Sequence, residues 1–309
     1  MQERADLTGI RDCRGSYPDP YMTRDEDTRI ALLLDARSSE LDLAGLLDEH
    51  WRLIGKPPEL AARFTAHDLA AAARSQEIVD AVGAARGRPL GTGDRVLEVG
   101  CGSAALAAAV ARRGAAVTAT DVSLRWLVLA RKRLAEEGLA GVRLVCCAAE
   151  EPLLPEESFD AVLASDVVEH VESPQDFVAG CGRVLRPGGL LFLATPNRYS
   201  LGLEPHVRLP LVGYLPRPLA TRYVRAVRGA PYDHVRLLSA RELRRLLEEK
   251  GFEVTIVAPE VPEASRQLYH GIERSLVEVY NRARRFPPAH AALLAVGPFL
   301  HVFARKRAA

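Results

Sequence analysis

The sequence predicts an α/β fold with a mostly parallel sheet, and two observations predict it. From Asp94 onward, short apolar runs alternate with segments of helical spacing, which is the pattern of strands joined by crossover helices. The first run, residues 95–99, ends in a glycine turn that opens an alanine-rich helix. A chain of 309 residues is long enough to bury a large core around such a sheet.

The first ninety residues predict a separate helical region. Apolar residues recur at helical spacing in residues 23–36, 41–51 and 59–82. The following segment, residues 83–93, is rich in Gly, Arg and Pro and predicts a linker. We therefore expect an N-terminal helical region over residues 1–90, serving as a substrate lid, and a core over residues 91–309.

The sequence of the core region predicts seven strands and one insertion. Residues 198–236 interrupt the connection after the fifth strand with sequence rich in Pro, Arg and Leu. An insertion there lies over the carboxyl ends of the strands, where open α/β sheets bind ligands, so we expect it to complete the lid. Ser239 and Glu242 form a capping box at the start of the helix before the sixth strand. The strands are expected at residues 95–99, 116–120, 142–146, 159–164, 190–194, 252–258 and 299–305.

The turn after the first strand has the features of a nucleotide-binding turn. Gly100 and Gly102 let the backbone bend and approach a ligand that a Cβ would meet, and Ser103 is expected to cap the next helix. Glu98 is placed to accept a hydrogen bond from an ammonium group. Asp121, at the end of the second strand, is placed to accept both hydroxyls of a ribose. In the alternative interpretation these acids only cap helices or face solvent.

Three later segments fit the same pattern. One, Cys147 to Glu150, follows the third strand; another, Pro155 to Leu163, opens the fourth strand; the last, Arg183 to Leu191, leads into the fifth strand. Together with the turn and Asp121, they resemble the class I S-adenosylmethionine (SAM) dependent methyltransferases, in particular the type 11 and ubiquinone-biosynthesis-like domains, over residues 75–258. The resemblance implies a Rossmann-like sheet of seven strands whose last strand runs antiparallel between the fifth and sixth. It also implies S-adenosyl-L-methionine as the cofactor.

The resemblance also implies which residues bind the cofactor. Two positions depart from the usual pattern: Ala148 stands where many relatives carry Asp, and Ala104 stands where many carry a third glycine. The implied contacts are Glu98, Gly100, Cys101 and Gly102 at the methionine end and the turn, Asp121 and Val122 at the ribose and adenine, Ala148, Ala149 and Glu150 at the adenine, and Ser165 at the methionine moiety.

Catalysis of methyl transfer requires alignment and at most one base, because the sulfonium already activates the carbon. His170 is the first candidate, since histidine titrates near neutrality and can take the proton of a hydroxyl. Asp166 lies on the same segment, and His206 and His234 lie in the insertion. In the alternative interpretation, His170 bonds a neighbouring loop and the other two histidines pin the lid.

The pair Glu169 and His170 resembles an acid and histidine pair that some ubiquinone-type relatives use near a divalent metal. Adjacent residues of a helix point apart, so no metal is predicted here.

The composition of the chain argues against nucleic-acid-binding and membrane-spanning proteins and indicates a reduced setting. A net charge of +1 argues against general nucleic-acid binding. No signal peptide and no transmembrane run are visible. The cysteines are odd in number, with no paired metal spacing, which predicts a reduced cytoplasmic setting; the five are Cys13, Cys101, Cys146, Cys147 and Cys181.

The insertion and the helix after it are basic. Ten arginines stand against Glu204, Asp233 and Glu242 between Arg198 and Arg245, which suggests an anionic acceptor or, alternatively, a solvated helix face. Interleaved Leu, Val, Tyr and Arg in residues 209–227 leave open a peripheral membrane contact.

These features predict a SAM-dependent methyltransferase acting on a small molecule, at a hydroxyl oxygen in preference to other atoms, in secondary-metabolite, quinone or glycan biosynthesis. Methylation at carbon or nitrogen and a glycan- or lipid-linked acceptor are alternatives. Two other classes stay open. Gly100, Gly102 and Ala105 with Asp121 also fit an NAD(P)-dependent oxidoreductase, and the fold can serve as a non-catalytic scaffold. The oligomeric state is open.

Overall fold

The apolar runs of the core form one eight-stranded sheet in the order β1-β4-β3-β2-β5-β6-β8-β7. The computed structural model describes residues 7, 9–13, 22–229, 231–261, 263–266 and 271–308. Every described pairing is parallel except those of β8, which runs antiparallel to both neighbours. The strands are β1 Ile10–Asp12, β2 Arg95–Val99, β3 Ala116–Asp121, β4 Arg143–Cys146, β5 Phe159–Ser165, β6 Leu185–Pro196, β7 Phe252–Val257 and β8 Phe299–Lys306.

The seven predicted strands are confirmed, and the last of them runs antiparallel between β6 and β7 as expected. The strand count is wrong by one, because β1 adds an edge strand that pairs Ile10 with Leu144 of β4. Three residues with a single aliphatic side chain show no alternation, so no periodicity marks β1 in the sequence.

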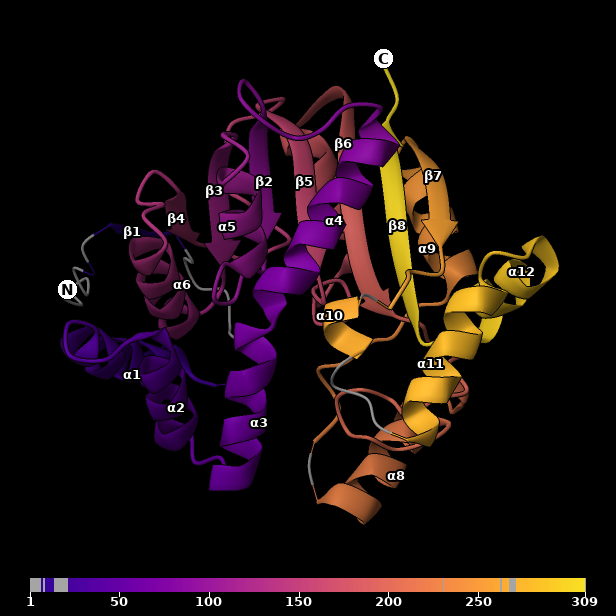
Figure 1. Cartoon of the computed structure of the whole chain (residues 1–309), viewed down its shortest axis with the longest axis horizontal. Helices are drawn as coiled ribbons and strands as arrows, with labels where there is room; N and C mark the ends of the chain where they lie inside the picture. Colours follow the sequence, from indigo (N-terminus) through magenta and orange to yellow (C-terminus); the bar gives the residue numbers. More distant parts are fainter. Residues whose placement is uncertain are drawn as a thin grey trace.

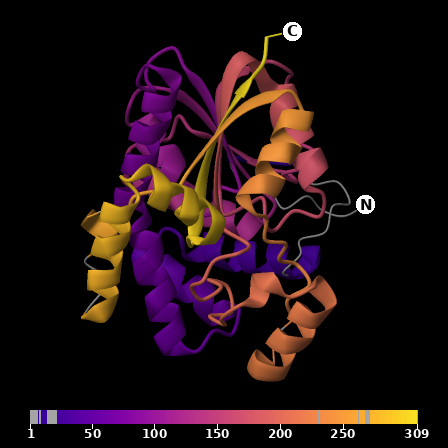
Figure 2. The same ribbon diagram turned by 90° about the vertical axis from the view of Figure 1, so that its right-hand side faces the viewer.

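Helices cover both faces of the sheet (Figure 2). On one face, α4 Ala71–Arg86, α5 Ala105–Ala111 and α6 Leu124–Glu136 share a core with side chains such as Val96 and Val117. On the other face, α7 Pro174–Val184 and α9 Ala240–Glu249 pack on side chains such as Leu97. Successive residues of β2 therefore enter opposite cores, which explains why its run is apolar throughout.

The N-terminal helices gather where the parallel strands end (Figure 1). They are α1 Arg24–Arg37, α2 Leu43–Leu53 and α3 Pro58–Leu69. The single helix expected over residues 59–82 is two helices, α3 and α4, that meet at Ala70. No Gly or Pro marks this break, and helical spacing continues across it. While α3 extends past the sheet edge, α4 packs on α5 as part of the core.

The insertion, residues 198–236, forms a small unit at the same end of the sheet as α1–α3. It contains the short 3-10 helix η1 Val212–Tyr214 and α8 Arg217–Arg228. Its own small core joins Val212, Val224, Tyr232 and their neighbours. Beyond β7 lie α10 Glu263–Arg266, α11 Ile272–Ala283 and α12 Pro287–Val296. None of the described helices is long and apolar enough to cross a membrane.

The predicted capping box is confirmed, since the Ser239 hydroxyl and the Glu242 carboxylate each pair with the other's backbone N–H at the start of α9. All five cysteines are free, and four of them are buried. Burial raises the pKa of the Cys147 thiol to about 12, so this thiol is unreactive at neutral pH.

Candidate functional site

The turn between β2 and α5 adopts the backbone that its glycines predict. Gly100 has φ +67°, and a Cβ there would lie 2.4 Å from Cγ2 of Val167. Gly102 has φ +50°. Ala104 also adopts a left-handed conformation, with φ 60°. The expected cap by Ser103 is wrong, because α5 begins after Ala104 with no side-chain cap.

Asp121 lies at the end of β3, and its carboxylate is held by the backbone on two sides. Oδ2 accepts the Gly102 N–H at 2.9 Å, and Oδ1 accepts the Ser123 N–H at 2.9 Å. The side chain is nearly buried but lines the cavity described below. These bonds fix the plane of the carboxylate beside the glycine turn, in the place where a ribose is expected.

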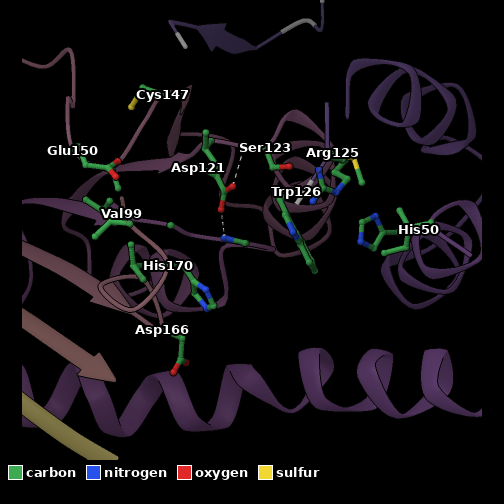
Figure 3. Close-up of a pocket in the computed structure, with 18 of the residues that line it drawn as sticks. His50, Val99, Asp121, Ser123, Arg125, Trp126, Cys147, Glu150, Asp166 and His170 are labelled. Atoms are coloured by element: carbon green, nitrogen blue, oxygen red, sulfur yellow. Dashed lines mark hydrogen bonds between the residues drawn. The ribbon is translucent and has the colours of Figure 1, made fainter. Parts of the chain in front are cut away.

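A cavity of about 620 Å³ opens between these loops and the N-terminal helices (Figure 3). Its volume lies in the range of small-molecule and cofactor sites. One part of the wall comes from the loops after β2, β3, β4 and β5, and another part comes from α2 and the start of α6. The lining residues include Gly100, Gly102, Asp121, Val122, Ser123, Arg125, Trp126, Cys147, Ala149, Glu150, Asp166, His170, Met22, His50, Trp51, Ile54 and Lys56.

The structure brings most of the expected cofactor residues to this cavity. Of the predicted site residues, Gly100, Gly102, Asp121, Val122, Ala149, Glu150, Asp166 and His170 line it. Glu98, Cys101, Ala148, Ser165, His206 and His234 do not line it. For this second group, contact with a ligand stays a prediction.

Glu98 lies behind the turn, fully enclosed by protein. Its Oε2 accepts the Ala107 N–H of α5 at 2.8 Å. Burial raises the pKa of Glu98 to about 8, and the nearby Asp121 carboxylate adds to that rise, while the Ala107 hydrogen bond opposes it. In the structure Glu98 therefore ties the turn to α5.

His170 is at the centre of a histidine cluster. Its Nε2 lies 3.1 Å from Nε2 of His206, and Nδ1 of His206 lies 2.5 Å from the Glu204 carboxylate. Burial, together with the nearby His206 and His234, lowers the pKa of His170 to about 3. Burial also lowers the pKa of His234. His170 is therefore neutral at pH 7, the form that can accept a proton.

Glu169 shares this cluster. Its Oε2 accepts a hydrogen bond from the Thr195 hydroxyl at 3.0 Å, whereas its buried Oε1 has no hydrogen-bond partner among the described residues. Ligand atoms of Glu169, His170 and His206 lie within 4.8 Å of one another. The prediction that Glu169 and His170 point apart is wrong, because residues 168–170 form a turn rather than a helix. One carboxylate and two imidazoles are a donor set that divalent metals accept.

Asp166 begins the segment that carries these residues, and it lines the cavity. Its φ of 57° is a left-handed conformation that costs a non-glycine residue free energy and is often found at functional sites. Figure 3 shows its carboxylate on the same side of the cavity as His170.

An aromatic part of the wall was not predicted. The rings of Trp51 and Trp126 lie 5.7 Å apart between centroids, and His50 packs 4.8 Å from Trp126. Burial lowers the pKa of His50 to about 3, so this imidazole is neutral. No motif marks these residues, because they come from two helices far apart in the chain. That the chain's two tryptophans meet is visible only in the fold.

Comparison with known proteins agrees with this geometry. The family described as "Methyltransferase domain" matches residues 97–193, a segment that contains the glycine turn, Asp121 and His170. Residues 97–193 of this chain therefore match a methyltransferase domain. The glycine turn thus lies within the segment that matches a methyltransferase domain.

Two relatives of this methyltransferase domain are bacterial enzymes named ubiquinone biosynthesis O-methyltransferase. The protein of Methylocella silvestris is 40% identical over 164 residues, which cover 52% of this chain and 58% of that protein. The protein of Rhizobium leguminosarum bv. trifolii is 35% identical over 170 residues, covering 54% and 62%. The match thus spans less than two thirds of the length of these relatives.

Two solved structures share the fold of about three quarters of this chain. A putative sarcosine dimethylglycine methyltransferase from Galdieria sulphuraria aligns with a TM-score of 0.51 and 15% identity, over 76% of this chain and 86% of that one. The [4+2]-cyclase SpnF aligns with a TM-score of 0.50 and 22% identity, over 76% and 82%. Because one of these proteins is named a cyclase, the fold alone does not fix the reaction.

Proposed function

We propose that this protein transfers the methyl group of S-adenosyl-L-methionine to a hydroxyl oxygen of a small-molecule acceptor. One observation carries the proposal: within the methyltransferase domain, the Asp121 carboxylate is fixed beside the Gly100–Gly102 turn at the wall of a cavity of about 620 Å³. The names of the bacterial relatives support oxygen as the methylated atom and quinone biosynthesis as one setting.

Asp121 and Val122 would bind the ribose and adenine, and Ala149 and Glu150 would complete the adenine site. The methionine end would lie along Gly100 and Gly102, toward Asp166. The reactive methyl group would then lie on the side of the cavity that His170 lines. Binding would align the sulfonium carbon with the acceptor oxygen, which is the main contribution that such a site makes.

His170 is the proposed base. A neutral imidazole can accept the hydroxyl proton as the new C–O bond forms and the C–S bond breaks, which leaves the methylated acceptor and S-adenosylhomocysteine. The Glu204 carboxylate behind His206 stabilises positive charge on this pair of imidazoles. His234, 45% buried on the same side, is the second candidate.

The pair Glu169 and His170, for which the sequence predicts no metal, resembles an acid and histidine pair that some ubiquinone-type relatives use near a divalent metal. The residues fit such an ion, because the buried Oε1 of Glu169 has no hydrogen-bond partner among the described residues. Glu169, His170 and His206 would hold it, and with His170 bound to the ion the role of base would pass to His234. A bound cation would make the acceptor hydroxyl more acidic.

The lining of the cavity supports a proposal for the charge of the acceptor. An anionic group would meet Lys56, which is exposed at the wall, whereas Arg125 is already paired with Asp27. We assign the anion contact to Lys56, and we assign a peripheral membrane contact to α8, where Arg217, Arg222 and Arg225 lie exposed. A cytoplasmic location stays a prediction from the reduced cysteines.

Calorimetric titration tests the proposal. The protein should bind S-adenosylhomocysteine and not NAD, and Asp121→Ala should weaken binding at least tenfold. Asp80→Ala, which removes an exposed partner of Arg113, is the matched control and should bind like wild type. Binding of NAD alone would support an oxidoreductase. Binding of neither ligand would support a non-catalytic scaffold. Mass analysis of products from hydroxylated acceptors then separates methylation at oxygen from methylation at carbon or nitrogen.

A further inference from the structure

Two aspartates of the N-terminal helices bind the loops that form the cofactor site. Asp27 of α1 is fully buried. Its carboxylate accepts hydrogen bonds from the Ser123 hydroxyl and the Leu124 N–H, both at 2.8 Å. It also pairs with Arg125 at 2.7 Å. Asp27 thereby caps the start of α6, which has no side-chain cap of its own.

Asp68 of α3 makes similar contacts with the turn between β2 and α5. Its carboxylate accepts the Ser103 hydroxyl at 2.6 Å and pairs with Arg133 at 2.7 Å. The Nε of Arg133 donates to the Ser103 carbonyl at 2.9 Å. Each arrangement therefore joins an aspartate from an N-terminal helix, a serine from a nucleotide loop and an arginine from α6.

The two arrangements flank Asp121. Ser103 follows Gly102, whose N–H donates to one Asp121 oxygen, and the backbone of Ser123 donates to the other. A continuous path of bonds therefore runs from Asp68 through both loops and the Asp121 carboxylate to Asp27. The four residues Ser103, Ser123, Arg125 and Arg133 are at most 5% exposed, so water screens these contacts little.

We infer that Asp27 and Asp68 are positioning residues of the cofactor site, which hold the Asp121 carboxylate through the two serines. This inference rests on the proposed function. It assigns the N-terminal helices a part in cofactor affinity besides covering the acceptor. Because coupling between two equilibria is reciprocal, a bound cofactor should in turn hold α1 and α3 on the core.

Calorimetry with S-adenosylhomocysteine on the full chain tests this assignment. Asp27→Asn and Asp68→Asn should each weaken binding about tenfold. Ser123→Ala should weaken binding about threefold, whereas Ser123→Thr, which keeps the hydroxyl, should bind like wild type. Asp35→Asn is the matched control, because Asp35 also joins α1 to α6 through Arg131 but touches neither loop; it should change binding less than twofold.

Hydrogen exchange on the unaltered protein gives a second test that does not depend on the folding of a variant. Added S-adenosylhomocysteine should slow amide exchange in residues 24–37 and 58–69. Wild-type binding without such protection, or equal losses in Asp27→Asn and Asp35→Asn, would overturn the positioning role and leave the proposed function standing. Failure of the wild-type protein to bind S-adenosylhomocysteine would overturn both.

Discussion

At the scale of single residues, the glycine turn contains one conformation that its side chain disfavours. Ala104 has φ 60°, where an L-residue with a Cβ is strained. The surrounding contacts hold it there, because Ala104 is fully buried between the turn and α5.

Replacing this alanine should relieve the strain. We expect Ala104→Gly to raise the free energy of unfolding by about 1 kcal/mol, the usual cost of a left-handed non-glycine residue. Ala108→Gly, in the middle of α5, should lower it by at least about 1 kcal/mol, since glycine is unfavourable inside a helix. Urea unfolding measures both, and a loss of stability in Ala104→Gly would show that the strain is absent.

Glu98 predicts a pH dependence of stability. Its pKa in the folded chain is about 8, above the ordinary value of 4.5, so the folded state binds this proton more tightly than the unfolded state. Stability from this group is fully present below the ordinary value and is lost as pH rises through about 8.

Glu98→Gln removes that titration but keeps an oxygen for the Ala107 N–H. The free energy of unfolding of the variant minus that of wild type should therefore increase by a few kcal/mol from pH 5 to pH 9. Urea unfolding at the two pH values measures the difference. An equal difference at both would mean that Glu98 ionises normally.

At the scale of elements, the loop after β5 brings together groups that the sequence separates. Glu169 and His170 come from this loop, while His206 comes from the insertion. A bound metal would therefore join the insertion to the core.

Cobalt titration followed by its visible absorption tests this site. The wild-type protein should bind Co²⁺, and Glu169→Gln and His206→Ala should each weaken binding at least tenfold. Glu204→Gln should weaken it less, because Glu204 is not itself a ligand and acts on the metal only through its hydrogen bond to the ligand His206. His234→Ala is the control. Binding that is unchanged in His206→Ala would remove the insertion from the site.

The elements also show what the sequence can predict. The strand ends, the turn and Asp121 are predictable, because backbone chemistry fixes residue type there. Three features are not. The break between α3 and α4 has no Gly or Pro, β1 is too short for a pattern, and Glu169 and His170 converge only because their segment is a turn. Contacts of the N-terminal helices, such as Asp27 with Ser123, depend on tertiary packing alone.

At the scale of the whole molecule, the insertion has a core separate from the two cores on the faces of the sheet. Val224 is fully buried in it, beside residues such as Val212 and Tyr232. A unit with few residues and its own core can open while the sheet stays folded.

Val224→Ala should therefore loosen the insertion selectively. We expect faster proteolysis within residues 198–236, while the main unfolding transition of the sheet shifts by less than about 1 kcal/mol, because the lost contacts lie outside its cores. Limited proteolysis and urea unfolding measure the two effects. Phe177→Ala, in the core under α7, should instead lower the main transition by about 3–5 kcal/mol. Equal effects of the two variants on the main transition would show one cooperative unit.

The aromatic wall has a practical consequence for finding the acceptor. Trp51 and Trp126 are the only tryptophans in the chain, and both line the cavity. The tryptophan fluorescence of the protein therefore originates at the site itself. Any compound that enters the cavity and displaces water from these indoles should change the emission, so unlabelled collections of hydroxylated molecules can be screened with the native chain, before any methylated product is known.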